Sequence, residues 1–214
     1  DSAFTADCLI ELYEQQKKWE QLVDVYQRRV DLTDPEDADL RYELLVASAS
    51  CYEKEFKDRL RAIELLVQAL DAKPNDQAVL LRLNALYREE HQWPELLENL
   101  RTQASIAETP EARAGFYRDM GDLLAKKLDN YPDALEAYQV VLQEIPSDAA
   151  ARTAVRGIGQ EHEELREDVA NILLSALQTA RLFEDVVEVL ELRLSVESDP
   201  LDRAQTLRAM ARTL

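Results

Sequence analysis

The amino-acid sequence predicts an all-α fold in which antiparallel helical hairpins stack into an α-solenoid of about twelve helices. Glycine and proline are scarce, with four and seven copies in 214 residues, which argues against a β-sandwich, a β-barrel or a glycine-rich phosphate loop. Apolar residues recur at helical spacing, whereas no segment alternates as a β-strand does. Short markers also recur in a constant order along the chain, which is typical of repeat proteins.

Three markers define the repeat. In the first, an aromatic residue is followed by two residues that include an acidic one and then by two apolar residues, at Trp19, Trp93 and Phe183. The other two markers are tripeptides that contain proline. They are Asp34-Pro35-Glu36, Thr109-Pro110-Glu111 and Asp199-Pro200-Leu201 for the second, and Pro74-Asn75-Asp76 and Pro146-Ser147-Asp148 for the third. Because the aromatic rings recur at one register, we interpret them as packing residues rather than as ligand contacts.

The proline markers have a physical meaning at the start of a helix. Asp34, Thr109 and Asp199 are N-cap residue types, whose side-chain oxygen accepts a hydrogen bond from a free amide of the first turn. The proline after each occupies the first helical position, where its missing amide costs nothing. Asn75 and Ser147 are expected to cap the helices that follow them in the same way. The markers therefore predict helix N-termini.

Together, the markers and the apolar stripes predict helices at residues 3–16, 19–32, 35–54, 58–72, 75–90, 93–107, 110–128, 131–144, 148–158, 163–181, 183–196 and 200–213. Connections of about two to six residues make successive helices antiparallel. A single hairpin of this kind cannot bury a core alone, so the hairpins must stack on one another. Equivalent markers in the first part of the chain lie 72 to 75 residues apart, which corresponds to two hairpins.

Two of the second helices share the pattern small-x3-large-x2-small-x4-Pro, and first helices carry a glycine or a tyrosine at related positions. The residues are Ala62, Leu66, Ala69 and Pro74, then Ala134, Tyr138, Val141 and Pro146, with Gly121, Tyr13 and Tyr87 on first helices. In these residues the chain resembles the tetratricopeptide repeat (TPR) family, and the resemblance covers most of its length. It implies a right-handed, TPR-like solenoid, most similar to the divergent arrays of large bacterial repeat proteins. The other hairpins depart from the pattern, with Leu22, Leu96 or Val186 in place of the small residue.

The repeat spacing predicts three segments. Residues 1–146 form four TPR-like hairpins, residues 147–162 form an irregular joint with a short extra helix, and residues 163–214 form a further hairpin and an unpaired C-terminal helix. Gly157 and Gly159 are expected to end the extra helix. The joint could instead be a hinge that moves in function. The last helix carries an apolar stripe that ends at Leu214, so we expect either a longer array around this chain or self-association through that helix.

The formal charge of −18 excludes some partners. Residues 1–107 contain 13 basic and 22 acidic side chains and residues 108–214 contain 12 and 21, so each half carries −9. Such a surface repels nucleic acid and an anionic membrane leaflet. It fits either a basic partner or a solvated helical surface without one. No apolar run reaches the ~20 residues of a membrane span, so we expect no membrane insertion and a soluble protein, and we favour the cytoplasm without assigning it.

The sequence offers no specific signal for catalysis, and we expect no enzyme activity, no cofactor and no metal site. The two histidines, His91 and His162, are interpreted as solvated residues at helix ends, and they are too few for a three-histidine zinc site. The two cysteines, Cys8 and Cys51, are interpreted as small buried residues, with a disulfide or a reactive thiol as the alternative. A carboxylate pair of the glycosidase kind cannot be nominated among 43 acidic residues.

The TPR resemblance implies that first helices line a concave groove that binds a protein or peptide. The implied groove residues are Asp7, Glu11, Glu14, Glu43, Val46, Ser50, Glu53, Leu81, Ala85, Arg88, Arg118, Asp122 and Lys126. The family's lysine-rich carboxylate clamp is not matched, because Asp7, Val46 and Leu81 stand where a clamp lysine is expected. The sequence thus predicts a non-enzymatic interaction scaffold, with a structural module that contacts neighbouring repeats or copies as the alternative.

Overall fold

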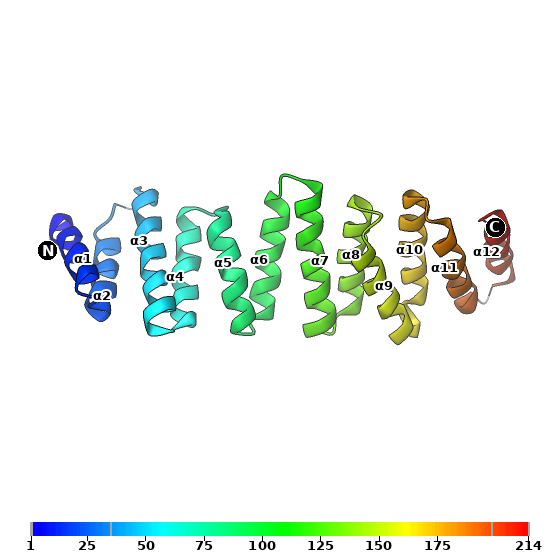
Figure 1. Cartoon of the computed structure of the whole chain (residues 1–214), viewed down its shortest axis with the longest axis horizontal. Coiled ribbons are helices and arrows are strands. Elements are labelled where there is room, and N and C mark those ends of the chain that lie inside the picture. The colour runs from blue at the N-terminus through cyan, green and yellow to red at the C-terminus, as the bar shows by residue number, and fades with distance from the viewer. Residues whose placement is uncertain (1, 35, 198, 214) are drawn as a thin grey trace. The chain divides into compact units, whose positions relative to one another are not determined.

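The structure, a computed structural model, describes residues 2–34, 36–197 and 199–213, except for the side chains of residues 183, 184, 196, 212 and 213. In these ranges the chain forms twelve α-helices and no strand (Figure 1), which confirms the predicted all-α fold. Contacts between residues divide it into two compact units, Asp1–Asn99 and Leu100–Leu214, and each unit is considered by itself.

Unit 1 is built from helical hairpins. Its elements are α1 (Ala3–Gln15), α2 (Trp19–Asp31), α3 (Ala38–Cys51), the π-helical turn η1 (Tyr52–Phe56), α4 (Arg59–Ala72), α5 (Gln77–Glu89) and the first part of α6 (Trp93–Ile106). α1 packs on α2, α2 on α3, and α3 on α4, so each hairpin covers the next. The buried amide of Asn99 on α6 donates to the Leu80 carbonyl and to Asn84 Oδ1 on α5, both at 2.7 Å.

Unit 2 contains two hairpins and a single helix between them. Its elements are the rest of α6, then α7 (Pro110–Lys127), α8 (Tyr131–Glu144), α9 (Ala149–Glu161), the 3-10 turn η2 (Glu163–Leu165), α10 (Arg166–Ala180), α11 (Phe183–Val196) and α12 (Pro200–Thr213). α7 pairs with α8, and α10 pairs with α11. α9 packs against both α8 and α10, which also contact each other directly.

The predicted helix caps are partly confirmed. Thr109 caps α7, with its hydroxyl accepting from the amide of Ala112 at 3.1 Å, and Pro110 is the first helical residue. Asp199 Oδ1 accepts from the amides of Leu201 and Asp202 at the start of α12. These two markers act as the cap chemistry requires.

The other three predicted caps are wrong by one to three residues. Asp76 caps α5 in place of Asn75, and Asp148 caps α9 in place of Ser147. α3 begins at Ala38 with Asp37 as its cap rather than at Asp34, whereas Pro35 lies outside the described residues. At each site a run of capping residue types stands before the helix, and the aspartate next to the first helical residue receives the amide hydrogen bond.

The expectation that α9 ends at its glycines is also wrong. The helix continues through Gly157 and Gly159 to Glu161. A Cβ added to Gly159 would lie 2.9 Å from Val169 Cγ1 on α10, so this glycine allows close approach of the two helices. Gly157 has open space around it. The division of the chain into 1–146, 147–162 and 163–214 stays a prediction.

A small residue against a large ring also joins α7 to α8. A Cβ on Gly121 would lie 2.7 Å from Cε1 of Tyr138, whose side chain is 1% exposed. Tyr138 is held from its other end as well, because its hydroxyl donates to Asp122 Oδ1 at 2.6 Å. Both residues belong to the TPR-like pattern in the sequence, so the pattern corresponds to an observed helix contact.

The turn inside each hairpin repeats one backbone conformation. Five residues have a positive φ of 49° to 57°, and each lies two positions before the second helix of a hairpin. They are Lys17, Lys57, His91, Asp129 and Arg181. The next amide donates back to a carbonyl near the end of the first helix, at 2.9 to 3.0 Å. This is the left-handed helix-ending motif that glycine usually supplies, and here no glycine marks it.

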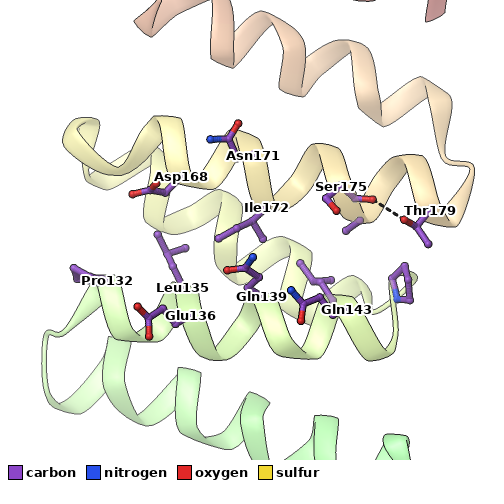
Figure 2. A pocket seen from close by; sticks show the side chains of 13 residues that line it. Pro132, Leu135, Glu136, Gln139, Gln143, Asp168, Asn171, Ile172, Ser175 and Thr179 are labelled. Carbon is purple, nitrogen blue, oxygen red and sulfur yellow. Dashed lines mark hydrogen bonds between the residues drawn. The ribbon is translucent and has the colours of Figure 1, made fainter.

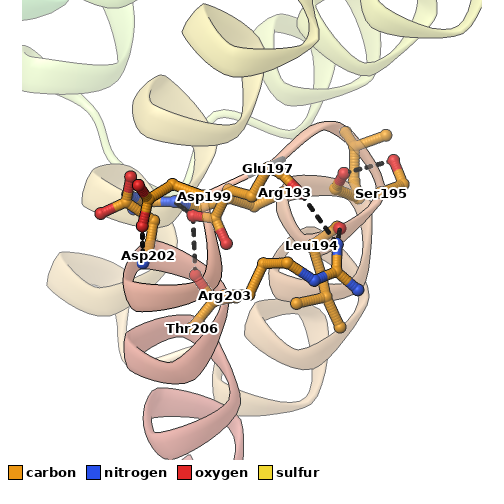
Figure 3. Close-up of polar contacts among 9 residues, drawn as sticks. Arg193, Leu194, Ser195, Glu197, Asp199, Asp202, Arg203 and Thr206 are labelled. Atoms are coloured by element: carbon orange, nitrogen blue, oxygen red, sulfur yellow. Dashed lines mark hydrogen bonds and ion pairs between the residues drawn. The ribbon is translucent and has the colours of Figure 1, made fainter.

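A polar cluster fixes α12 to α11 (Figure 3). The carboxylate of Glu197 accepts from Arg193 Nε at 2.7 Å and from the Thr206 hydroxyl at 2.8 Å. Arg203 Nη1 donates to the carbonyls of Leu194 and Glu197, each at 2.8 Å. The last helix therefore packs on its neighbour through defined hydrogen bonds, although Leu201 and Leu207 stay exposed. Leu214, the end of the predicted apolar stripe, lies outside the described residues.

We expect Gly121→Ala to lower the free energy of unfolding by about 1–3 kcal/mol, because the buried Tyr138 ring must shift to admit the Cβ. Gly115→Ala is the matched control on the same helix, with nothing within 4 Å of the added atom. That change should raise the free energy of unfolding by about 0.5–1 kcal/mol through helix propensity. Urea denaturation of the two variants measures both effects, and equal shifts in one direction would contradict the contact.

Candidate functional site

All thirteen implied groove residues lie on α1, α3, η1, α5 or α7, and none of them is buried. They are therefore placed on first helices, as the resemblance implies. Whether they form one binding surface stays a prediction. The contacts of each side chain show which of them are free to meet a partner.

Three implied groove carboxylates in unit 1 are held by neighbouring helices. Asp7 Oδ1 lies 2.7 Å from Nε of Arg29, which is buried on α2. Glu53 Oε2 lies 2.7 Å from Arg82 Nε on α5. Glu14 Oε1 accepts a 2.6 Å hydrogen bond from the Tyr26 hydroxyl. Burial and then this hydrogen bond to Glu14 raise the pKa of Tyr26 well above its ordinary value, so the phenol is held as a neutral donor.

The implied groove residues of unit 2 are also paired. Arg118 Nη1 lies 2.7 Å from Oδ2 of Asp148, the residue that caps α9. Asp122 accepts from Tyr138 and lies 3.1 Å from the ammonium group of Lys126. These side chains join helices to one another, so their first role is structural.

Four implied groove residues remain exposed without a hydrogen bond or ion pair in the described part of the chain. They are Glu11, Glu43, Leu81 and Ala85. Leu81 is 55% exposed, which is unusual for leucine. Ser50 and Val46 bond to each other, since the serine hydroxyl donates to the Val46 carbonyl at 2.9 Å.

A cleft that the sequence did not predict lies in unit 2, between α8 and α10 (Figure 2). Its volume is about 530 Å³, within the range of ligand sites. It is lined by Pro132, Leu135, Glu136, Gln139, Leu142, Gln143 and Pro146 from α8 and its C-terminal end, and by Asp168, Asn171, Ile172, Ser175, Ala176 and Thr179 from α10.

The cleft has an apolar base and polar walls. Leu135, Leu142, Ile172 and Ala176 are buried and form the base, whereas the carboxylate, amide and hydroxyl residues of the lining are exposed. Thr179 donates to the Ser175 carbonyl at 2.8 Å, a bond within α10. Such a combination suits a ligand that buries an apolar group while its polar atoms meet the walls.

Most polar side chains of the walls are not bonded to other residues of the described chain. Within the described residues, the side chains of Glu136, Gln139, Gln143, Asp168 and Asn171 make no hydrogen bond or ion pair. The lining contains two carboxylates and no lysine, arginine or histidine. This differs from most of the implied groove, whose charged residues already have partners inside the chain.

The sequence shows a polar face on each of the two helices, but it does not show that these two faces lie side by side. Glu136, Gln139 and Gln143 recur at helical spacing on α8, and Asp168, Asn171 and Ser175 do so on α10. Polar faces of this kind usually meet only water. The two come together where α9, expected as a short extra helix in the joint, packs on both α8 and α10, which also contact each other directly.

The cysteines, histidines and marker tryptophans differ in part from expectation. Cys8 is exposed and Cys51 half-buried, both as free thiols, so burial of Cys8 was wrongly predicted. Burial raises the pKa of the Cys51 thiol, which keeps it protonated. His162 lies against the Tyr131 ring in a tilted arrangement, with the ring centroids 3.8 Å apart. Trp19 and Trp93 are half-buried, and the side chain of Phe183 lies outside the described residues.

Over the described ranges, no cluster of three or more histidine, cysteine or acidic side chains is arranged to hold a metal ion. In the same ranges, no helix combines the length and the hydropathy needed to cross a bilayer. The cleft between α8 and α10 is taken as the candidate functional site.

No protein-family model matches the chain, and no curated protein sequence matches it. Among solved structures, it is similar to a crystal structure of MamA, with 15% identity over 82% of this chain and 96% of that one, and to a MamA RS-1 double mutant, with 16% identity over 93% and 98%. It is also similar to the C-terminal part of a TPR repeat-containing protein from Cytophaga hutchinsonii, with 11% identity over 99% and 83%. The TM-score is 0.45 in all three cases, so we base no argument on these similarities. The observed hairpins and the contact between Gly121 and Tyr138 agree with the resemblance drawn from the sequence.

Burial and the hydrogen bond to Asp122 raise the pKa of Tyr138 well above the ordinary tyrosine value of about 10. The unfolded chain therefore ionises this phenol at a pH where the folded chain keeps it neutral, and stability falls as the pH rises above about 10. Tyr138→Phe lacks both the hydrogen bond and the ionisation. We expect the stability gap between wild type and variant to narrow by about 1.4 kcal/mol from about pH 9 to about pH 11 in urea unfolding. A gap that is independent of pH would contradict this role.

Proposed function

We propose that this chain is a non-enzymatic scaffold that binds a protein or peptide segment. The observation that carries the proposal is the cleft between α8 and α10, with its volume of about 530 Å³, its apolar base and its unpaired polar walls. Its lining combines an apolar base with amide, hydroxyl and carboxylate side chains, which supports the binding of a peptide.

The exposed first-helix residues Glu11, Glu43, Leu81 and Ala85 are proposed as a second contact surface in unit 1. They are the implied groove residues that are exposed and that make no hydrogen bond or ion pair within the described ranges. This surface is acidic at two positions and carries one exposed leucine. It supports contact with a protein surface, as the TPR resemblance implies.

Filling the cleft should abolish binding at this site. Ser175→Trp places an indole between the walls from an exposed position of α10, whereas Gln178→Trp adds the same group to an exposed position of α10 that does not line the cleft. The probe is a displayed library of random peptides of about seven residues, a length that spans a cleft of this size in extended form. Peptides enriched on wild type should bind Ser175→Trp at least about tenfold more weakly and Gln178→Trp unchanged, measured by fluorescence anisotropy. Equal binding to all three proteins, or no enrichment, would contradict the proposal.

A structural assembly module is the second candidate, because α12 keeps two large apolar side chains in solvent. Leu201 is 69% exposed and Leu207 is 52% exposed. If this face meets another copy, sedimentation velocity should show concentration-dependent association that Leu207→Glu abolishes. A monodisperse monomer at high concentration would count against this candidate.

A further inference from the structure

We infer that the cleft between α8 and α10 binds an extended peptide segment that places a lysine or arginine side chain between Glu136 and Asp168. The inference rests on the proposed scaffold function and specifies the chemistry of its partner. It is drawn from the direction of the two walls, from the type of the polar groups on them and from the distribution of charge.

The two walls run in the same direction. α8 and α9 are joined by a short connection, as are α9 and α10, so α8 and α10 are both antiparallel to α9 and parallel to each other. Figure 2 shows the residue numbers rising in the same direction on both walls. The wall from Asp168 to Thr179 is about 16 Å long at the helical rise, which accommodates about five residues of extended chain. The cleft therefore has two distinguishable ends.

The cleft beyond its charged end is suited to main-chain atoms. Gln139 and Asn171 near its middle and Gln143 farther along α8 each offer an amide donor and an amide acceptor that have no partner in the described part of the chain. An extended peptide presents free N–H and C=O groups to such side chains, whereas a helical segment has already satisfied its own. Between the amides, Leu135 and Ile172 form an apolar base for one side chain of the peptide.

The charge of the cleft is concentrated at one end. Glu136 and Asp168 lie near the N-terminal ends of their helices, whereas Gln143, Ser175 and Thr179 at the other end are uncharged (Figure 2). Asp168 is in the first turn of α10, where the helix dipole favours an acidic residue in any case. Glu136 lies beyond the first turn of α8, so the dipole does not explain its presence.

A positively charged group would complement the two carboxylates at this end of the cleft. No basic residue lines the cleft, and the chain as a whole carries a charge of −18. A lysine or arginine side chain would form charge-assisted hydrogen bonds with the two carboxylates. An acidic peptide or a nucleic acid would be repelled by them. The same charges should make association sensitive to salt.

The test compares a charge variant of the cleft with a matched control. Glu136→Gln combined with Asp168→Asn removes both carboxylates of the cleft. Glu167→Gln combined with Glu191→Gln removes two exposed carboxylates that do not line it, one of them in the same first turn of α10. Peptides of about seven residues, selected from a random displayed library on the wild-type protein, are the probes.

Selected peptides should share a lysine or arginine at one position near one end. Their dissociation constants, measured by fluorescence anisotropy at about 0.1 M salt, should rise roughly fivefold on the cleft charge variant and stay unchanged on the control. Their salt dependence should weaken on the cleft charge variant as well. Replacing the shared basic residue by glutamine should reproduce the loss on wild type but cause no further loss on the cleft charge variant.

Two results would overturn the inference. Peptides that Ser175→Trp blocks but that show no basic preference, or that bind the charge variant as tightly as wild type, would overturn it while leaving the scaffold proposal standing. Failure to select any peptide that Ser175→Trp blocks would overturn both the inference and the cleft as a peptide site.

Discussion

The inner helices of this chain have buried apolar residues on more than one part of their surface, so they are covered by the helices before and after them. α10 shows the constraint clearly, because Val169, Leu173 and Leu177 are fully buried while Ile172 and Ala176, on a different part of its surface, form the base of the cleft. A hairpin alone would leave one of these faces in water. Stacking therefore follows from the distribution of apolar residues, and the remaining features of each unit depend on how closely neighbouring helices can approach.

Close approach depends on a few small residues. Gly121 admits the ring of Tyr138 between α7 and α8, and Gly159 admits Val169 between α9 and α10. The second contact holds the single helix α9 against the hairpin of α10 and α11. With α9 in this place, α8 and α10 run parallel and present two polar faces to one another. Because α8, α9 and α10 alternate in direction, α8 and α10 are parallel, and their direct contact places their polar faces on the two sides of one cleft.

Polar residues on the helix surfaces divide into two groups with different consequences. One group, including Asp7, Glu53 and Arg118, bonds to an adjacent helix or to its cap and so belongs to the fold. The other group has no partner in the described ranges and is available for recognition. Sequence position alone does not separate them, because both kinds occur at outward-facing positions of amphipathic helices. The contacts of each side chain make the distinction, and they move the candidate site from the implied groove of first helices toward the cleft between α8 and α10.

The sequence by itself determined the helices and their order, since periodicity, N-cap chemistry and proline position act within a few residues. Its errors are local as well: Asp76 rather than Asn75 caps α5 because both residue types can cap, and the left-handed turn at Lys57 was not predicted because no glycine marks it. Only the tertiary structure decided which outward-facing residues are free and where two polar faces meet. That information depends on contacts between helices, such as the close approach of Gly159 on α9 to Val169 on α10. The helical periodicity within one segment does not specify such a contact. A one-dimensional pattern specifies each helix surface but not the neighbour that covers it.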